Sequence, residues 1–177
     1  MTHELDHIFV ATQSGAPECR FVTAAGFIEG PLHDHPGQGT ASRGFFFENA
    51  YLELIWLTDA QVAAAEPIRR TGLVRRVDPM SGVSPFGFGL RSTREPVPWA
   101  RTASWRVPEH PNGVRRITRV SFSCAASPSS RVLSDFLELG LVLRDEGDVP
   151  ILQIDFDWRR QGQNLDLRPH LPLLLFF

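Results

Sequence analysis

The amino-acid sequence predicts an α+β fold in which two similar modules face each other. The main observation is a pattern that occurs twice, in residues 5–28 and 117–142: a strand-like run leads into a helical stretch that ends at a glycine and is followed at once by an apolar pair. The length of 177 residues and the hydrophobic content of 42% are enough for one domain with a proper core. Because two half-sheets that face each other form a cleft, this arrangement favours binding of a small molecule.

We therefore expect a single domain with three parts. Module one spans about residues 4–58, a connector with a hairpin about 59–115, and module two about 116–177.

Module one opens with a strand. Alternation over residues 5–11 places Leu5, His7, Phe9 and Ala11 on one face, with Asp6, Ile8 and Val10 on the other. Residues 18–25 read as a short helix closed by Gly26, because glycine commonly forms the left-handed cap that ends a helix. The remaining elements expected in module one are a strand at 27–32, a polar glycine-rich loop at 33–40, and strands at 44–48 and 51–57 joined by a tight turn.

The elements of the connector and of module two are predicted from the same kinds of local sequence pattern. A helix is expected at 59–66, before Pro67, and a strand at 86–90 in an otherwise Pro-, Gly- and Trp-rich stretch. In module two we expect a helix at 131–139 that ends at Gly140, and strands at 117–123, 141–144, 151–156 and 164–167.

Composition excludes several classes of partner. The net charge of −2, from 18 basic and 20 acidic residues, gives no case for nucleic acid. No apolar run approaches the roughly 20 residues that span a bilayer, and the N-terminus has no leader pattern, so we expect no membrane association and a cytoplasmic location. All basic residues are arginine, which excludes a lysine Schiff base. Cys19 and Cys124 share no short spacing and read as free thiols.

Two polar residues stand inside apolar strand patterns. His7 lies between Leu5 and Phe9 on one predicted face, and Glu53 lies between Tyr51 and Ile55 on another. A charge placed in such surroundings is costly unless it is paired or bound to a metal. Two interpretations stay open: the two side chains pair with each other or with an arginine, or they hold a divalent ion.

The repeat assigns counterparts in module two. Arg119 lies 112 positions after His7 (119 minus 7), and Asp166 lies 113 positions after Glu53 (166 minus 53). Arg119 is either a structural partner of Asp166 or the group that holds a substrate carboxylate through a bidentate pair. An arginine is not a metal ligand and would oppose a cation.

The predicted loop 33–40 is a second candidate region. It carries His35, Gln38 and Thr40 among glycines, so its side chains and backbone N–H groups could hold a polar ligand. The alternative is a solvated turn. Tyr51, on the predicted face of Glu53, is a further candidate for contact with the substrate.

Three segments together resemble a known family. These are residues 5–11 (LDHIFVA), 35–40 (HPGQGT) and 45–54 (FFFENAYLEL), and they resemble the glyoxalase-like domain of the vicinal oxygen chelate superfamily, which includes glyoxalases, bleomycin-resistance proteins and dioxygenases. Residues 84–91 and 110–113 are also similar to that group. The resemblance implies paired βαβββ modules that form a curled mixed sheet around a cleft. In metal-using members the first-strand His and fourth-strand Glu are ligands, which by motif position are His7 and Glu53, whereas Arg119 stands where such members place another ligand.

Two functions follow as expectations. The first is a metal-free binding protein that sequesters or senses a small aromatic or acidic compound in the cleft between the modules. The alternative is a divalent-metal-dependent lyase, isomerase or ring-cleaving dioxygenase, with Zn, Ni, Mn or Fe held by His7 and Glu53 and with Glu53 also shuttling a proton as the catalytic residue. A homodimer could complete either site.

Overall fold

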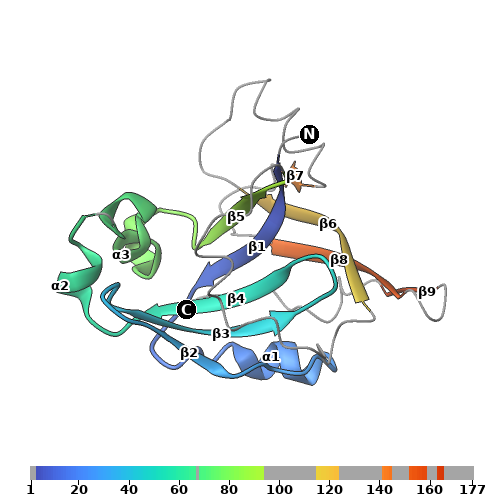
Figure 1. The fold of residues 1–177 in the computed structure, drawn as a ribbon, viewed down its shortest axis with the longest axis horizontal. Helices are drawn as coiled ribbons and strands as arrows, with labels where there is room; N and C mark the ends of the chain where they lie inside the picture. The colour runs from blue at the N-terminus through green and yellow to red at the C-terminus, as the bar shows by residue number, and fades with distance from the viewer. Residues whose placement is uncertain are drawn as a thin grey trace.

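The computed structural model in Figure 1 describes residues 3–66, 68–93, 115–123, 141–144, 152–158 and 163–165. It contains two β-sheets and a few short helices, which confirms the α+β class. The first sheet has five strands in the order β2-β3-β4-β1-β5, and the second has four in the order β7-β6-β8-β9. Among the described helices, none is both long and apolar enough to cross a membrane.

The bounds of the elements are as follows. The strands of the first sheet are β1 (His3–Ala11), β2 (Leu32–His35), β3 (Thr40–Phe46), β4 (Tyr51–Leu57) and β5 (Phe86–Ser92). Those of the second sheet are β6 (Arg115–Ser123), β7 (Leu141–Arg144), β8 (Leu152–Trp158) and β9 (Gln163–Leu165). The helical elements are α1 (Cys19–Ala24), α2 (Ala60–Ala63), η1 (Ile68–Thr71), α3 (Leu73–Arg76) and η2 (Pro79–Ser81).

The first sheet is built mainly from one continuous stretch of chain. Residues 3–57 run as strand, helix and three strands, and β1 lies parallel to β4 while β2, β3 and β4 pair antiparallel. The connector then adds β5 antiparallel to the other edge of β1. As a result β1 lies inside the sheet, between a strand of its own module and one from the connector.

The second sheet repeats only part of this plan. Its central strand β6 also has one parallel neighbour, β7, and one antiparallel neighbour, β8. However, β7 is the next described strand after β6, whereas β4 is the fourth strand of its module. The predicted helix at 131–139 lies outside the described residues.

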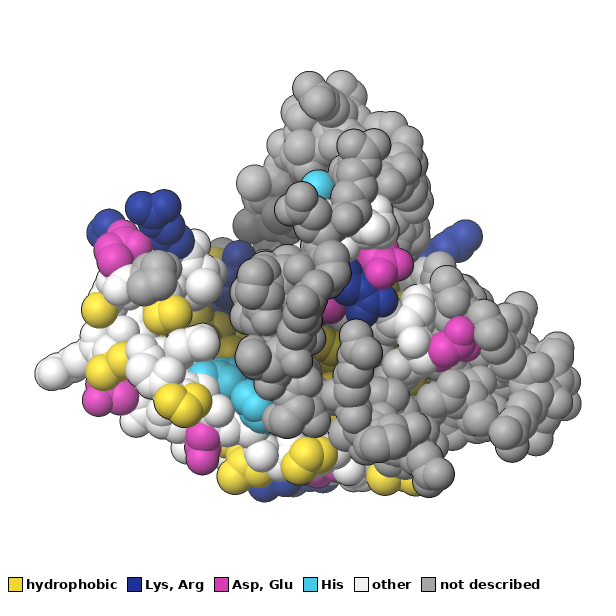
Figure 2. Space-filling view, viewed as in Figure 1, with side chains coloured by type: hydrophobic (Ala, Val, Ile, Leu, Met, Phe, Trp, Pro, Cys, Tyr) yellow, Lys and Arg dark blue, Asp and Glu magenta, His cyan; other side chains and the backbone are white. Residues whose placement is uncertain are grey.

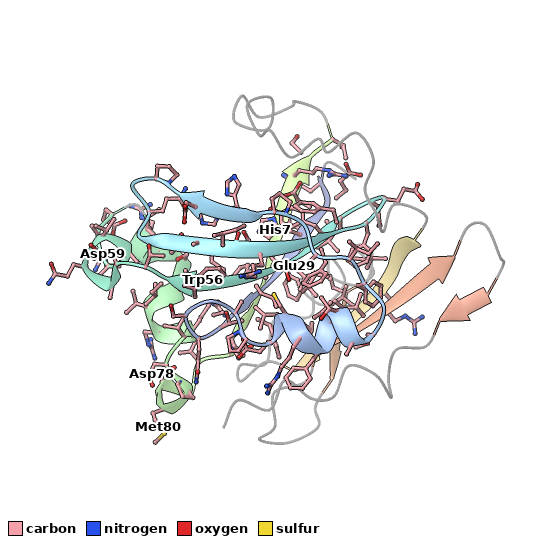
Figure 3. All side chains as sticks on the ribbon, turned by 90° about the horizontal axis from the view of Figure 1, so that it is seen from below. His7, Glu29, Trp56, Asp59, Asp78 and Met80 are labelled. Carbon is pink, nitrogen blue, oxygen red and sulfur yellow. The ribbon has the colours of Figure 1, made fainter. Side chains whose placement is uncertain are left out.

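The two faces of the first sheet differ in character. Ile8 and Val10 of β1 and Leu54 of β4 point to one face and are fully buried. Helix α1 packs on that face through Cys19 and Val22, as Figure 3 shows from below. The same core includes residues of the second sheet: Ile117, Val120, Leu141 and Ile154. The opposite face carries the polar residues described in the next subsection.

The prediction for residues 27–40 was wrong in its boundaries. Strand β2 occupies Leu32–His35 instead of 27–32, and β3 begins at Thr40 instead of residue 44. The intervening turn contains Gly37 and Gly39, with φ of 76° and 66°, values that a glycine adopts without strain. Pairing along β3 makes a strand of a segment whose polar composition favours a loop.

The predicted face of Leu5 was also wrong. The register between β1 and β5 shifts between Leu5 and His7, which is the signature of a β-bulge. The irregularity breaks the two-residue alternation, so Leu5 joins Ile8 and Val10 in the core while His7 stays half-buried on the other face.

The helix expected at 59–66 is shorter than predicted, although the Asp59 side chain caps α2 by accepting from the backbone N–H groups of Gln61 and Val62. In contrast, Gly26 ends α1 as predicted, with φ of 83°.

Candidate functional site

Three polar side chains converge on the face of the first sheet that is turned away from α1. The register places His7 of β1 beside Tyr51 of β4, and Gly44 of β3 opposite Glu53. The Glu53 carboxylate lies 4.0 Å from Nε2 of His7 and 3.7 Å from Nε2 of His35. We call His7, His35 and Glu53 the acceptor cluster. The structure thus brings His7 and Glu53 together, as the sequence predicts, and adds His35 from β2.

Glu53 is the centre of the cluster and is nearly buried. Its residue exposure is 8%, yet within the described part of the chain neither carboxylate oxygen takes part in a hydrogen bond, since the nearest imidazole nitrogens are 3.7 and 4.0 Å away. A buried carboxylate without hydrogen bonds is costly. The site therefore has unused capacity to accept hydrogen bonds or bind a positive charge.

The orientation of His7 is fixed by its neighbour in sequence. Nδ1 of His7 lies 2.9 Å from Oδ2 of Asp6. Because a carboxylate only accepts, Nδ1 of His7 is the donor to Asp6, and Nε2 is the ring nitrogen that faces Glu53. Burial acts to raise the pKa of Asp6, but the hydrogen bond and charge of His7, together with Arg91, outweigh it and leave that pKa lowered.

The rings of His7 and Phe9 each lie over a glycine of β5. The His7 ring also stacks on Tyr51, with ring centroids 4.8 Å apart. A Cβ atom added at Gly89 would lie 2.0 Å from Cε1 of His7, and one at Gly87 would lie 2.1 Å from the Phe9 ring. The alternation of Phe and Gly in 86–89 therefore gives the two rings room to lie flat on the strand.

His35 is held by hydroxyl groups. Its Nδ1 lies 2.8 Å from Oγ1 of Thr40, and its Nε2 lies 3.3 Å from Oγ of Ser42. Burial lowers the pKa of His35, and the charge of Glu53 opposes this effect without cancelling it. The neutral imidazole is therefore favoured near pH 7. His35 and Thr40, predicted as loop residues that bind a ligand, instead pair across the β2–β3 hairpin at the edge of the cluster.

Aromatic rings flank the cluster. Phe46 stacks on Tyr51 at 5.3 Å, so Phe46, Tyr51 and His7 form a row of stacked rings across β3, β4 and β1. Burial raises the pKa of Tyr51, and the carboxylates of Glu53 and Asp6 raise it further. The phenol is therefore neutral at physiological pH. Figure 2 shows histidine side chains at the surface beside hydrophobic ones. The side chains of His7 and His35 are 20% and 14% exposed.

Several predicted site residues lie elsewhere. Gln38 is exposed in the turn between β2 and β3, where its backbone N–H donates to the carbonyl of His35. Arg119 is exposed on the second sheet and faces Asp155 in the β6–β8 ladder. Asp166, Cys124 and the segment 110–113 lie outside the described residues. Cys19 is a buried thiol whose pKa is raised to about 12, mainly by burial, which agrees with its interpretation as unreactive.

Sequence reasoning missed a connection between the two sheets. The side-chain amide of Asn49, in the turn before β4, donates to the carbonyl of Ile117 and accepts from its N–H, both at 2.9 Å. Arg91 of β5 donates to the carbonyl of Asn49 and to Asp6. The irregular part of β6 is thus linked through Asn49, Arg91 and Asp6 to His7. An Asn before a strand signals a turn, but nothing local reveals its partner in the other sheet.

The acceptor cluster does not have the spacing of a transition-metal site. No group of three or more His, Cys, Asp or Glu residues that could hold a metal ion is found in the ranges that the structure describes. Bonds of about 2.0–2.1 Å to zinc would require ligand–metal–ligand angles above about 120° across separations of 3.7 and 4.0 Å, against roughly 109° in a tetrahedral site. The residues therefore do not fit the ion without closing inward.

Comparisons with known proteins found no match for this chain among protein-family models, curated proteins or solved structures. The α+β class and the geometry of the acceptor cluster therefore stand on the structure alone.

Proposed function

We propose that this chain is a glyoxalase-like protein that binds a small molecule at the acceptor cluster, on the face of the first sheet turned away from α1. The observation that carries the proposal is Glu53: a nearly buried carboxylate that faces two imidazoles and has no hydrogen bond within the described residues. A ligand that donates to these acceptors would remove a cost that the free protein bears.

The arrangement of the first sheet supports the glyoxalase-like assignment. Residues 3–57 have the order β1-α1-β2-β3-β4, with the first strand parallel to the fourth, which is the βαβββ plan that the resemblance implies. His7 and Glu53 lie on these two strands, at the positions that the resemblance gives to functional residues. The second sheet supports the paired plan less directly: β6, like β1, lies between one parallel and one antiparallel strand.

A thermal-shift screen of a metabolite panel, with and without added divalent ions, tests binding. At a ligand concentration of about 100 times Kd the stabilisation is about 2.7 kcal/mol, or roughly 5–10 °C for a chain of this size. We expect the shift to disappear in Glu53→Gln and to persist in Glu66→Gln, which alters an exposed glutamate on the α2–η1 segment. No stabilisation by any compound, or equal shifts in both variants, would contradict the proposal.

The alternative is a divalent-metal-dependent lyase, isomerase or dioxygenase. It is favoured by the Asp6–His7 hydrogen bond, because metal-binding histidines commonly donate their second N–H to a carboxylate. The separations within the acceptor cluster oppose it. Metal analysis of protein purified without chelator decides between them: a stoichiometric ion that is lost in both His7→Gln and Glu53→Gln would favour the enzyme.

A further inference from the structure

We propose that the acceptor cluster recognises an organic ammonium group attached to an apolar body. This inference rests on the proposed function and specifies the class of its ligand. Three features of the site support it: the hydrogen-bonding capacity of the cluster, the distances between its polar atoms, and the aromatic surface around it.

The first argument is hydrogen-bonding capacity. Nδ1–H of His7 is engaged with Asp6, so in the neutral ring Nε2 offers a lone pair beside the Glu53 carboxylate. In the tautomer of His35 that donates Nδ1–H to Thr40, Nε2 accepts from the Ser42 hydroxyl at 3.3 Å. The free acceptor capacity of the cluster therefore lies in the Glu53 carboxylate and Nε2 of His7. A primary ammonium carries three N–H donors and no acceptor, which is the complement of this set.

The second argument is size. An ammonium nitrogen about 2.8 Å from two acceptors that are 3.7 or 4.0 Å apart subtends an angle of about 80–90°. An ammonium group can therefore donate to both atoms of either pair at ordinary hydrogen-bond lengths, whereas zinc bonds of about 2.0–2.1 Å would span each pair only at angles above about 120°. The spacing therefore favours donors at hydrogen-bond distance over a coordinated ion of short bond length.

The third argument is the surrounding surface. The row of Phe46, Tyr51 and His7 places aromatic rings next to the carboxylate, where they can pack against the apolar body of the ligand, and the face of an aromatic ring attracts an organic cation. Competing positive charges nearby are already engaged. Arg76, over the Phe9 ring, donates to the carbonyls of Ser84 and Phe86, and Arg91 pairs with Glu4 and Asp6.

Three probes that share a phenylethyl body and differ in the charge of the end group test the inference. Titration calorimetry would compare phenethylammonium, 2-phenylethanol and 3-phenylpropionate on the full chain after dialysis against EDTA, with Zn²⁺ alone as a fourth titrant. We expect phenethylammonium to bind at least about tenfold more tightly than the other two organic probes, since a charge-assisted bond to Glu53 forms only with the cation. Glu53→Gln should abolish this preference, whereas Glu66→Gln should retain it.

The location of binding is checked without a variant. Proton–nitrogen correlation spectra of the imidazoles should show phenethylammonium shifting the Nε2 signals of His7 and His35 but not those of the exposed His3, at the start of β1. This readout keeps the test decisive should Glu53→Gln fail to fold.

The outcomes separate this inference from the proposed function. If the neutral or anionic probe binds more tightly and shifts the same imidazole signals, the ammonium assignment is overturned while binding at the cluster stands. If Zn²⁺ alone binds more tightly than any amine, and only when Glu53 is present, the cluster is a metal site and the inference also fails. If no probe of any charge shifts these signals and the metabolite screen is also negative, both proposals fall.

Discussion

Strands β1 and β6 have the same kind of neighbours but present different chemistry. Each lies between one parallel and one antiparallel strand, and each has a register irregularity at the same point, between Leu5 and His7 in β1 and between Ile117 and Arg119 in β6. After the irregularity, β1 presents His7, half-buried beside Glu53, whereas β6 presents Arg119, which is exposed.

The difference lies in the neighbouring strands. His7 is paired in register with Gly89 of β5, so its ring can lie over the strand, whereas Arg119 is paired in register with Asp155 of β8. Similar backbone surroundings therefore hold a half-buried histidine in one sheet and an exposed arginine in the other, and in the first sheet the glycine of β5 provides the room for the ring.

Gly89→Val should be the most disruptive change. Its Cβ would lie 2.0 Å from Cε1 of His7, which is far closer than two non-bonded carbon atoms can approach. The ring must therefore leave its place against β5. We expect a loss of about 1–3 kcal/mol in the free energy of unfolding by urea and loss of ligand binding. Leu90→Ala, at an exposed neighbouring position, is the control. If the imidazole NMR signals of His7 are unchanged in Gly89→Val, glycine in β5 is not what makes room for the site.

Asn49→Ala should weaken the connection between the sheets. It removes two hydrogen bonds to the backbone of Ile117 and leaves that buried residue without these partners. We expect a loss of about 2 kcal/mol in unfolding free energy. Asn49→Asp, which keeps the acceptor but not the donor, should be less damaging. Hydrogen exchange should show the backbone N–H of Ile117 less protected in Asn49→Ala; equal protection in both proteins would contradict the assigned contact.

The stability of the protein should decrease as the pH falls below about 6.5. Burial lowers the pKa of His35 in the folded state, so the unfolded chain binds more protons in this range. The stabilisation that comes from neutral His35 is fully present above the unfolded pKa and is lost as the pH drops through the folded value. Among the charged neighbours of His35, Glu53 and Asp34 act to raise its pKa and His33 acts to lower it. His35→Gln should flatten this slope between pH 7 and 5, and His3→Gln, at an exposed position at the start of β1, should not.

Arg119→Gln should have the smallest effect. The side chain is exposed on β6, and substitutions at exposed positions change stability by no more than about 0.5 kcal/mol. His7→Gln, at the matching position of β1, should instead abolish ligand binding. If the two variants lose binding equally in calorimetry, Arg119 belongs to the site and the contrast between the two strands is wrong.

Part of this molecule is predictable from local pattern. Alternation identified β4 and the faces of Tyr51 and Glu53, and a polar residue inside an apolar run marked both His7 and Glu53 as unusual. The glycine after a short helix predicted the end of α1. These features follow from the sequence because strand alternation and helix capping depend only on residues a few positions apart.

The remaining features depend on contacts between distant segments. Segment 32–35 is polar enough to be a loop, and only its pairing with β3 makes it a strand and brings His35 to Glu53. The bulge that turns Leu5 to the core is defined against β5, more than 80 positions away, and the partner of Asn49 lies in the other sheet. The sequence by itself determined which residues are polar within apolar strands. Only the tertiary structure decided which of them meet, because strand order and register are set by long-range pairing that no local pattern encodes.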